Sequence, residues 1–158
     1  MRITDTGLIP RSAPVLMDTH IWVWMASNDD TRVAAGTIEA LEEAAQDGRL
    51  LASAASVWEI ALKSASGDLM AGTDLHAWVA QQQETPGVRL LTITPTLAID
   101  VTLLPAWIRR RDNKPHRDPN DRFIVATARR RGAVLATCDE AILEYADDGH
   151  VTVYDARR

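Results

Sequence analysis

Short apolar runs alternate along the chain with longer stretches in which apolar residues recur at helical spacing. An apolar run of four to eight residues that ends at polar or turn residues is typical of a buried strand. The runs that predict strands are 14–18, 50–53, 88–92, 133–137 and 151–154.

Between these runs the apolar pattern changes to that of helices. In 31–46, Val33, Ile38, Leu41 and Ala45 recur at roughly helical spacing, while glutamates occupy other positions. The helices predicted in this way are 21–25, 31–46, 53–66, 75–83, 96–104, 119–131 and 139–145, with a charged loop at 107–119. Strands separated by helices predict an α/β fold in which a parallel sheet carries helices on both faces.

The composition fits one globular domain. The chain has 158 residues, of which 46% are hydrophobic and 25% charged, and this balance excludes an intrinsically disordered chain. We expect a single domain at 15–158, preceded by a leader or arm at 1–14 that lacks the continuous apolar core of a signal peptide. Because the single cysteine, Cys138, cannot form an internal disulfide and no apolar run approaches bilayer length, we expect a cytoplasmic protein with no membrane partner.

Charge is distributed unevenly. The net charge is −5, which disfavours broad nonspecific affinity for nucleic acid. However, residues 109–131 contain nine Lys or Arg and three Asp, so this window carries +6 and the remainder −11. The window is either a phosphate-attracting stretch or a solvated loop followed by a charged helix end.

Acidic residues follow the predicted strands at the edge where an open parallel sheet binds its ligands. Asp18 ends the first strand, and Asp139 follows the strand 133–137 after one residue. Glu59 lies on the helix after the second strand, while Asp118 and Asp121 lie at the start of the helix before the strand 133–137. All five can therefore converge on one edge of the sheet.

Such a cluster suits a hard divalent cation. Magnesium prefers oxygen ligands, retains several waters, and is typically fixed by one or two carboxylates together with a substrate phosphate. One or two such ions can orient and deprotonate a water molecule and neutralise charge on a phosphodiester. Without an ion, crowded carboxylates repel one another, and at least one pKa should rise.

Each acid also has a purely structural interpretation. Asp18, Asp118, Asp121 and Asp139 stand where a carboxylate stabilises a helix N-terminus. Glu59 precedes Lys63 by four residues, which is the spacing of an ordinary surface ion pair.

Three separated motifs resemble those of the PIN-domain family, specifically the VapC-like toxins of bacterial toxin-antitoxin pairs. The first is VLMDTHIWVW at 15–24. The second is ASAASVWEIALK at 52–63, followed by GDL at 67–69. The third is HRDPNDRFIVATA at 116–128, followed by GAVLATCDEAI at 132–142. Asn120 departs from the family pattern, which usually has an aromatic or apolar residue between the two aspartates of the third motif.

The resemblance implies a PIN-like three-layer α/β/α sandwich with a central, mainly parallel sheet. It implies a Mg²⁺- or Mn²⁺-dependent endoribonuclease that hydrolyses RNA by metal-activated water. By position, the implied catalytic metal ligands are Asp18, Glu59, Asp121 and Asp139, with Asp118 as a direct or water-mediated ligand. Small hydroxyl residues that orient acids or waters correspond to Thr19, Ser53 and Thr137, and possible phosphate contacts to His116 and Arg122.

The resemblance also implies partners. Toxins of this group are held inactive by a VapB-like antitoxin whose C-terminal segment crosses the active-site groove, and they commonly form homodimers. Four tryptophans, Trp22, Trp24, Trp58 and Trp107, either line that groove or interface or belong to the core.

Two other functions are compatible with an acid-rich sheet edge. A receiver-type phosphoacceptor domain would need an acceptor aspartate on a middle strand and a lysine after the last strand, and neither is evident. A PIN-like module that binds RNA or a protein partner without cutting would retain the same motifs. No Gly-rich phosphate loop follows a predicted strand, which disfavours a nucleotide-dependent enzyme.

Overall fold

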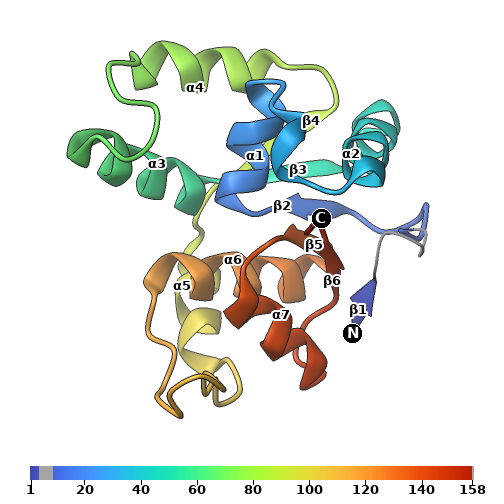
Figure 1. Cartoon of the computed structure of the whole chain (residues 1–158), viewed down its shortest axis with the longest axis vertical. Coiled ribbons are helices and arrows are strands. Elements are labelled where there is room, and N and C mark those ends of the chain that lie inside the picture. Colours follow the sequence, from blue (N-terminus) through green and yellow to red (C-terminus); the bar gives the residue numbers. More distant parts are fainter. Residues whose placement is uncertain (4–8, 158) are drawn as a thin grey trace.

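The predicted strands form the parallel sheet at the centre of the molecule (Figure 1). The computed structural model of the chain describes residues 1–3 and 9–157. Within these residues, six strands pair in parallel in the order β1-β6-β5-β2-β3-β4. Their bounds are β1 Arg2–Ile3, β2 Val15–Met17, β3 Leu50–Ser53, β4 Val88–Leu91, β5 Val134–Thr137 and β6 Val153–Asp155.

Helices cover both faces of the sheet, which confirms the three-layer α/β/α arrangement (Figure 1). One layer contains α1 Thr19–Ala26, α2 Ala35–Gln46, α3 Ala54–Ser66 and α4 Leu75–Glu84, with the 3₁₀ turn η1 Asp30–Arg32. The other contains α5 Pro95–Asp100, α6 Pro119–Arg131 and α7 Glu140–Asp147, with the 3₁₀ turn η2 Val101–Leu103.

Side chains of the central strands alternate between two cores. In β2, Val15 and Met17 pack with α1 and α2, whereas Leu16 packs with α6 and α7. Val134 and Leu135 of β5 divide in the same way. Successive side chains of a strand point to opposite faces, so a strand covered on both sides must be apolar at every position. This requirement explains the uninterrupted apolar runs in the sequence.

Most predicted elements are confirmed, and the differences have local causes. The predicted helix 31–46 is divided, because Val33 adopts an extended conformation (φ −126°) between η1 and α2 and is buried in the core. The predicted helix 96–104 forms as α5 followed by η2. Trp22 and Trp107 belong to the core, whereas Trp58 is 48% exposed.

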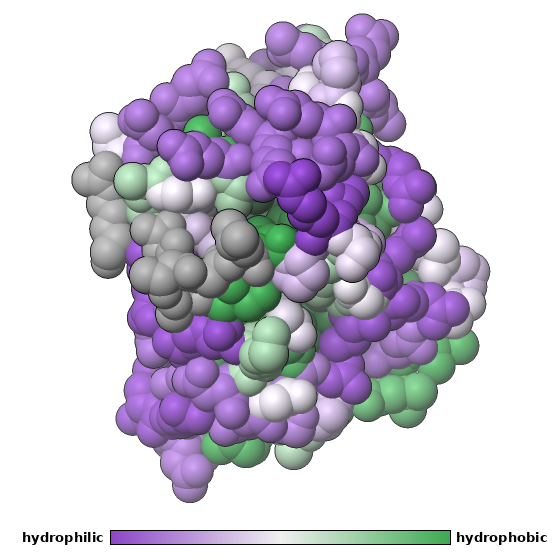
Figure 2. Space-filling model, turned by 90° about the vertical axis from the view of Figure 1, so that its right-hand side faces the viewer, coloured by the Kyte–Doolittle hydropathy of each residue, from purple (hydrophilic) through white to green (hydrophobic). Residues whose placement is uncertain are grey.

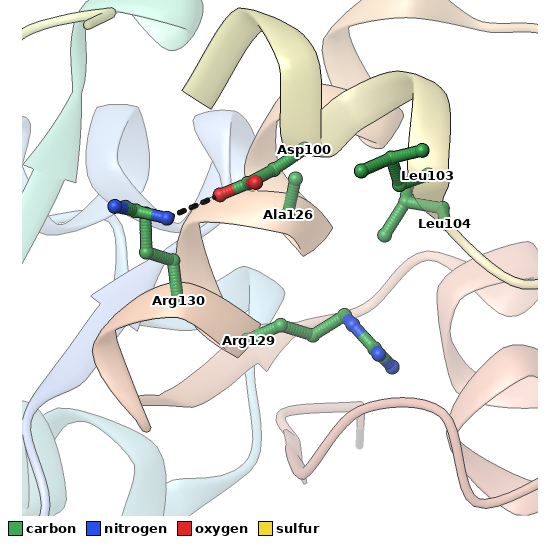
Figure 3. Close-up of a pocket in the computed structure, with 6 residues that line it drawn as sticks. All are labelled: Asp100, Leu103, Leu104, Ala126, Arg129 and Arg130. Atoms are coloured by element: carbon green, nitrogen blue, oxygen red, sulfur yellow. Dashed lines mark hydrogen bonds and ion pairs between the residues drawn. The ribbon is translucent and has the colours of Figure 1, made fainter. Parts of the chain in front are cut away.

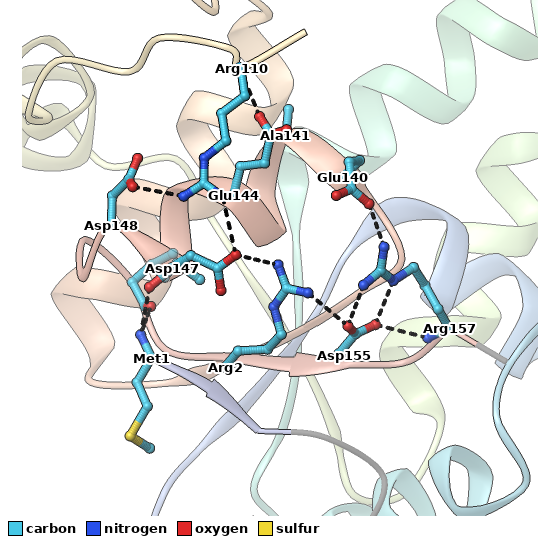
Figure 4. A network of polar contacts seen from close by, with 12 residues as sticks. Met1, Arg2, Arg110, Glu140, Ala141, Glu144, Asp147, Asp148, Asp155 and Arg157 are labelled. Carbon is cyan, nitrogen blue, oxygen red and sulfur yellow. Dashed lines mark hydrogen bonds and ion pairs between the residues drawn. The ribbon is translucent and has the colours of Figure 1, made fainter.

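The sequence pattern did not predict β1, which lies within the expected leader 1–14. Arg2 and Ile3 pair with β6 and add a sixth strand to the sheet. The Arg2 guanidinium lies 2.7 Å from Asp147 and 3.4 Å from Asp155 in a network of ion pairs around α7 (Figure 4). This part of the segment therefore belongs to the sheet, and residues 4–8 of the expected leader lie outside the described residues.

Apolar surface is distributed unevenly over the molecule. The side seen from the right of Figure 1 is mainly hydrophilic, with a smaller hydrophobic area near its centre (Figure 2). Large exposed apolar side chains occur instead on α3 and on the α5–η2 segment: Trp58, Leu62, Ile99 and Leu103. Across residues 1–3 and 9–157, no helix has the length and apolar character needed to span a membrane.

The turn before β4 depends on a glycine. Gly87 has φ +80°, and a Cβ atom there would lie 2.0 Å from the carbonyl oxygen of Ala45 in α2. Gly72 has a similar φ of +76°, but a Cβ atom there would meet nothing within 4 Å. The two positions therefore separate backbone strain from the additional effect of close packing.

We predict that Gly72→Ala lowers the free energy of unfolding by about 1 kcal/mol, the cost of a left-handed conformation for an L-residue. Gly87→Ala should cost about 3 kcal/mol or more, because the overlap with α2 adds to the same strain. Urea unfolding of both variants measures the difference. Equal losses would show that α2 does not constrain this turn.

Candidate functional site

Two neighbouring strands place the first two acids. β2 pairs with β5, with Met17 opposite Ala136. The backbone N–H of Asp18 donates to the carbonyl of Ala136 at 3.0 Å, so Asp18 leaves β2 beside the end of β5. Asp139 follows β5 after one residue. Both acids thus lie at the carboxyl end of the sheet, on adjacent strands that diverge into helices on opposite faces.

Three of the acids also cap helices. Asp18 caps α1 by accepting from Thr19 N at 2.7 Å, and Asp139 caps α7 by accepting from Ile142 N at 3.1 Å. Asp118 caps α6 by accepting from the first-turn amides of that helix. The capping interpretation is therefore confirmed for these acids. Capping fixes each carboxylate at a helix N-terminus, where the helix dipole favours negative charge.

One cavity brings all five predicted acids together. It has a volume of about 510 Å³ and is lined by Asp18, His20, Trp24, Arg32, Glu59, Lys63, Asp118, Asp121, Cys138 and Asp139. The lining residues come from the segments that directly follow β2 and β5, from α1, α3 and η1, and from the N-terminus of α6. Five carboxylates in one concave site supply a dense set of hard oxygen donors.

The carboxyl group of Asp18 is the most perturbed member of the cluster. Its burial, followed by the charges of Asp121 and Asp139, raises its pKa from 3.8 to about 7, against hydrogen bonds from Thr137 and the Thr19 amide. The Thr137 hydroxyl donates to Asp18 Oδ2 at 2.6 Å. The rise agrees with the expectation that crowded carboxylates without an ion titrate abnormally.

Asp121 is held by a buried histidine. His116 Nε2 lies 2.7 Å from Asp121 Oδ2, and its ring packs against Trp107 with a centroid distance of 4.3 Å. Burial, with the charges of Asp139 and Asp118, raises the pKa of Asp121, although the bond from His116 opposes this rise. Because an ionised carboxylate only accepts hydrogen bonds, the His116 proton lies on Nε2 when Asp121 is charged.

Glu59 occupies the α3 side of the cavity. Lys63 Nζ lies 2.6 Å from Glu59 Oε1, which confirms the predicted ion pair one helical turn apart. The amide of Asn120 donates to the other oxygen, Oε2. Burial acts to raise the pKa of Glu59, but hydrogen bonds from Lys63 and Thr19 outweigh it, so the pKa lies below its ordinary value.

The acids share a cavity but are not arranged as a finished metal site. Among the described residues, no three His, Cys, Asp or Glu side chains form a group that could hold an ion as they stand. Asp18, Glu59 and Asp121 instead bind Thr137, Lys63 and His116. The donor chemistry, five carboxylates in one cavity, fits a hard divalent cation such as magnesium or manganese.

The three predicted hydroxyl residues have different surroundings. Thr137 links two acids, because it donates to Asp18 and its oxygen accepts from the Asp139 amide at 3.0 Å. Thr19 donates to Ser56 Oγ at 2.9 Å. Ser53 caps α3 by accepting from an amide of its first turn. Thr137 and Thr19 therefore both bond to the side chain of an acid, Thr137 to Asp18 and Thr19 to Glu59.

Arg122 and most basic residues of 109–131 contact groups of the protein outside the acidic cavity. Arg122 donates to the backbone carbonyls of His116 and Val101, and neither Arg122 nor His116 lines the acidic cavity. Their contact with phosphate stays a prediction. Arg130 pairs with Asp100 beside a separate cavity of about 240 Å³ (Figure 3).

Other arginines of the same window are bound to acids near their own loop. Arg110 contacts Asp147 and Asp148 (Figure 4), and Arg109 contacts Asp112. The window therefore supplies local ion pairs, and most of its charge is not directed into the acidic cavity.

His20 and Arg32 line the cavity but were not singled out from the sequence, whereas Trp24 was one of the four tryptophans considered for the groove, and it does line the cavity. His20 and Trp24 lie one helical turn apart on α1, with ring centroids 5.7 Å apart. Arg32 comes from η1, and Lys63 was considered only as a partner of Glu59. The closeness of His20 to Asp18 in the first motif was an available signal, whereas no sequence pattern places Arg32 at the cavity.

Comparisons with known proteins agree with this geometry. The family model for the PIN domain matches residues 15–148. Ribonuclease VapC22 of Mycobacterium tuberculosis is 29% identical over 140 residues, which cover 89% of this chain and 98% of the relative. Among solved structures, Mycobacterium tuberculosis VapC20, a sarcin-ricin loop cleaving toxin, superposes with a TM-score of 0.56 at 20% identity, covering 91% of this chain and 99% of that one.

A second similar structure is VapBC2 from Rickettsia felis bound to a DNA fragment from its promoter. It has a TM-score of 0.59 at 12% identity and covers 88% of this chain and 96% of that chain. Since the family model matches residues 15–148, most of the sequence, the chain belongs to the PIN-domain family.

Proposed function

We propose that this protein is a metal-dependent endoribonuclease that acts as the toxin of a toxin-antitoxin pair. The observation that carries the proposal is the convergence of five carboxylates from three separate motifs on one cavity at the carboxyl edge of the sheet. The near full-length similarity to a VapC ribonuclease supports RNA as the substrate. Mycobacterium tuberculosis VapC20 has a similar fold and cleaves the sarcin-ricin loop, which supports cleavage within an RNA chain.

We propose that Asp18, Glu59, Asp121 and Asp139 hold Mg²⁺ or Mn²⁺, with Asp118 as a direct or water-mediated ligand. A divalent ion bound there supplies a Lewis acid and lowers the pKa of a water molecule, so no nucleophilic side chain is needed. Thr137 and His116 restrict the rotamers of Asp18 and Asp121 through bonds of 2.6 and 2.7 Å. Restricted acids present their oxygens at defined positions.

The cationic and aromatic wall of the same cavity offers contacts for the substrate. Arg32 and Lys63 line it together with His20, and the charges of Arg32 and Lys63 offset part of the negative charge that would by itself repel a phosphodiester. Trp24 adds an aromatic ring on which an unpaired base can stack. This combination of cationic and aromatic side chains favours a single-stranded segment of RNA as the substrate.

We further propose a VapB-like antitoxin and a second copy of the chain as partners. The chain resembles structures of VapBC assemblies in its fold. This similarity supports an antitoxin as a partner. The exposed apolar side chains of α3 and of the α5–η2 segment offer area for self-association: Trp58, Leu62, Ile99 and Leu103.

We predict that the purified protein cuts total cellular RNA into discrete fragments with Mg²⁺ or Mn²⁺ and not with EDTA. Asp18→Asn and Asp121→Asn should each lower the cleavage rate by at least about 100-fold, because each removes a charged ligand while keeping the size of the side chain. Gel analysis of the fragments measures the rates. Glu39→Gln, which alters an exposed acid of α2 outside the cavity, should cut like the wild type.

Equal inertness of the wild type and the two cavity variants, with RNA or antitoxin still bound, would favour a PIN-like module that does not cut. Cleavage that persists in EDTA would exclude the metal-dependent mechanism.

The raised pKa of Asp18 predicts a dependence of stability on pH. In the unfolded chain this carboxyl ionises near 3.8, whereas in the folded protein it retains its proton to about pH 7. Between these values folding takes up a proton, so the contribution of this group to stability is full below about pH 4 and is lost as the pH rises through 7. The loss from this group is at most about 4 kcal/mol.

Asp18→Asn should therefore flatten the loss of stability between pH 5 and 8, measured by urea unfolding in EDTA. Mn²⁺ should restore stability to the wild type at pH 8, because a ligand that binds only the native state stabilises it. Mn²⁺ should restore little stability to Asp18→Asn. If both proteins lose the same stability between pH 5 and 8, Asp18 is not the group that titrates.

A further inference from the structure

Asn120 is a buried polar residue in the middle of the third motif. It lies between Asp118 and Asp121 in the first turn of α6 and is 3% exposed. Burying an amide without partners costs free energy. An apolar residue at this position would avoid that cost, so the contacts of Asn120 should indicate what the amide does here.

The amide nitrogen of Asn120 has two acceptors. Nδ2 donates to Thr19 Oγ1 at 3.2 Å and to Glu59 Oε2. A carboxylate can only accept, so the nitrogen and not the oxygen must face Glu59. The Thr19 hydroxyl has a single proton, which goes to Ser56 Oγ at 2.9 Å or to Glu59, and in both cases its oxygen can accept from Asn120. The donors and acceptors are therefore consistent throughout.

These contacts join three helices beneath the cavity. Thr19 belongs to α1, Ser56 and Glu59 to α3, and Asn120 to α6. The other oxygen of Glu59 is bound by Lys63, one turn further along the same helix. Lys63 alone would let Glu59 turn along α3, whereas the bond from Asn120 holds it toward the helix that carries Asp118 and Asp121.

The remaining polar atom of Asn120 argues against a role in stability alone. Its Oδ1 is buried and has no hydrogen-bond partner among the described residues. An unsatisfied buried acceptor destabilises the folded state. An apolar side chain of similar size would remove that cost, so stability does not explain the amide.

We propose that Asn120 is a positioning residue that holds the Glu59 carboxylate in the acidic cavity, ready to bind the divalent ion together with the α6 acids. This inference rests on the proposed function in so far as Glu59 is a metal ligand. It adds to the five acids a residue that never touches the ion or the RNA and acts only through Glu59.

The test uses two substitutions that remove the same donor and differ in volume. Asn120→Ala leaves space, whereas Asn120→Leu fills it with apolar atoms. Thr127→Val is the matched control, because Thr127 is buried on the same helix and its hydroxyl, among the described residues, bonds to the carbonyl of Phe123 alone. Each is made in the wild type and in Glu59→Gln. Mn²⁺ affinity is measured by electron paramagnetic resonance of the free ion, and RNA cleavage gives kcat and KM.

We expect both Asn120 variants to weaken Mn²⁺ binding and to lower kcat, each by about tenfold, while KM for RNA changes little. A tenfold loss is the lower end of the range seen when a hydrogen-bond partner of a metal ligand is removed. In the Glu59→Gln background neither should add a further loss, since the group through which Asn120 acts is already altered. Thr127→Val should resemble the wild type in both measurements.

Two results would overturn the inference. Full Mn²⁺ affinity and kcat in Asn120→Leu would show that position 120 only fills space. Losses as large in the Glu59→Gln background as in the wild type would show that Asn120 does not act through Glu59. A wild type that binds Mn²⁺ without cutting RNA would contradict the proposed function alone, because the Mn²⁺ measurements would still decide the role of Asn120.

Discussion

The burial of the Asp18 carboxyl group at the end of β2 is the constraint on which the site depends. The parallel pairing of β2 with β5 brings Asp18 beside Thr137 and close to Asp139. The packed strands leave this group little contact with water, and the neighbouring acids add repulsion, so its charge is costly unless a cation compensates it. The sheet order that builds the core thus also creates the demand for positive charge.

The protein meets part of that demand with its own side chains. Lys63 and Asn120 both bind Glu59, His116 binds Asp121, and Thr137 donates to Asp18. These partners explain how the fold tolerates five acids in one cavity. They also define what a divalent ion must displace or share, which links the stability of the fold to the occupation of the site.

The sequence was sufficient for the framework and for the positions of the acids. Strands buried on both faces need uninterrupted apolar runs, so Asp18 and Asp139 could be recognised where such runs end. The resemblance indicated Thr137 as a residue that orients acids, but the sequence pattern did not identify Asp18, 119 residues away, as its partner. It also gave no sign that Asn120 binds Glu59, 61 residues away. Such pairs depend on the strand order. Arg2–Ile3 was missed because a two-residue strand has no pattern of its own.

A direct measurement of the central claim is the anomalous diffraction of manganese in crystals soaked with Mn²⁺ at pH 8. The account predicts a manganese peak in the cavity within bonding distance of Asp18 and at least one of Asp121 and Asp139, with no such peak in crystals of Asp18→Asn. A saturated crystal with no manganese in this cavity, or with manganese bound only elsewhere on the surface, would contradict it.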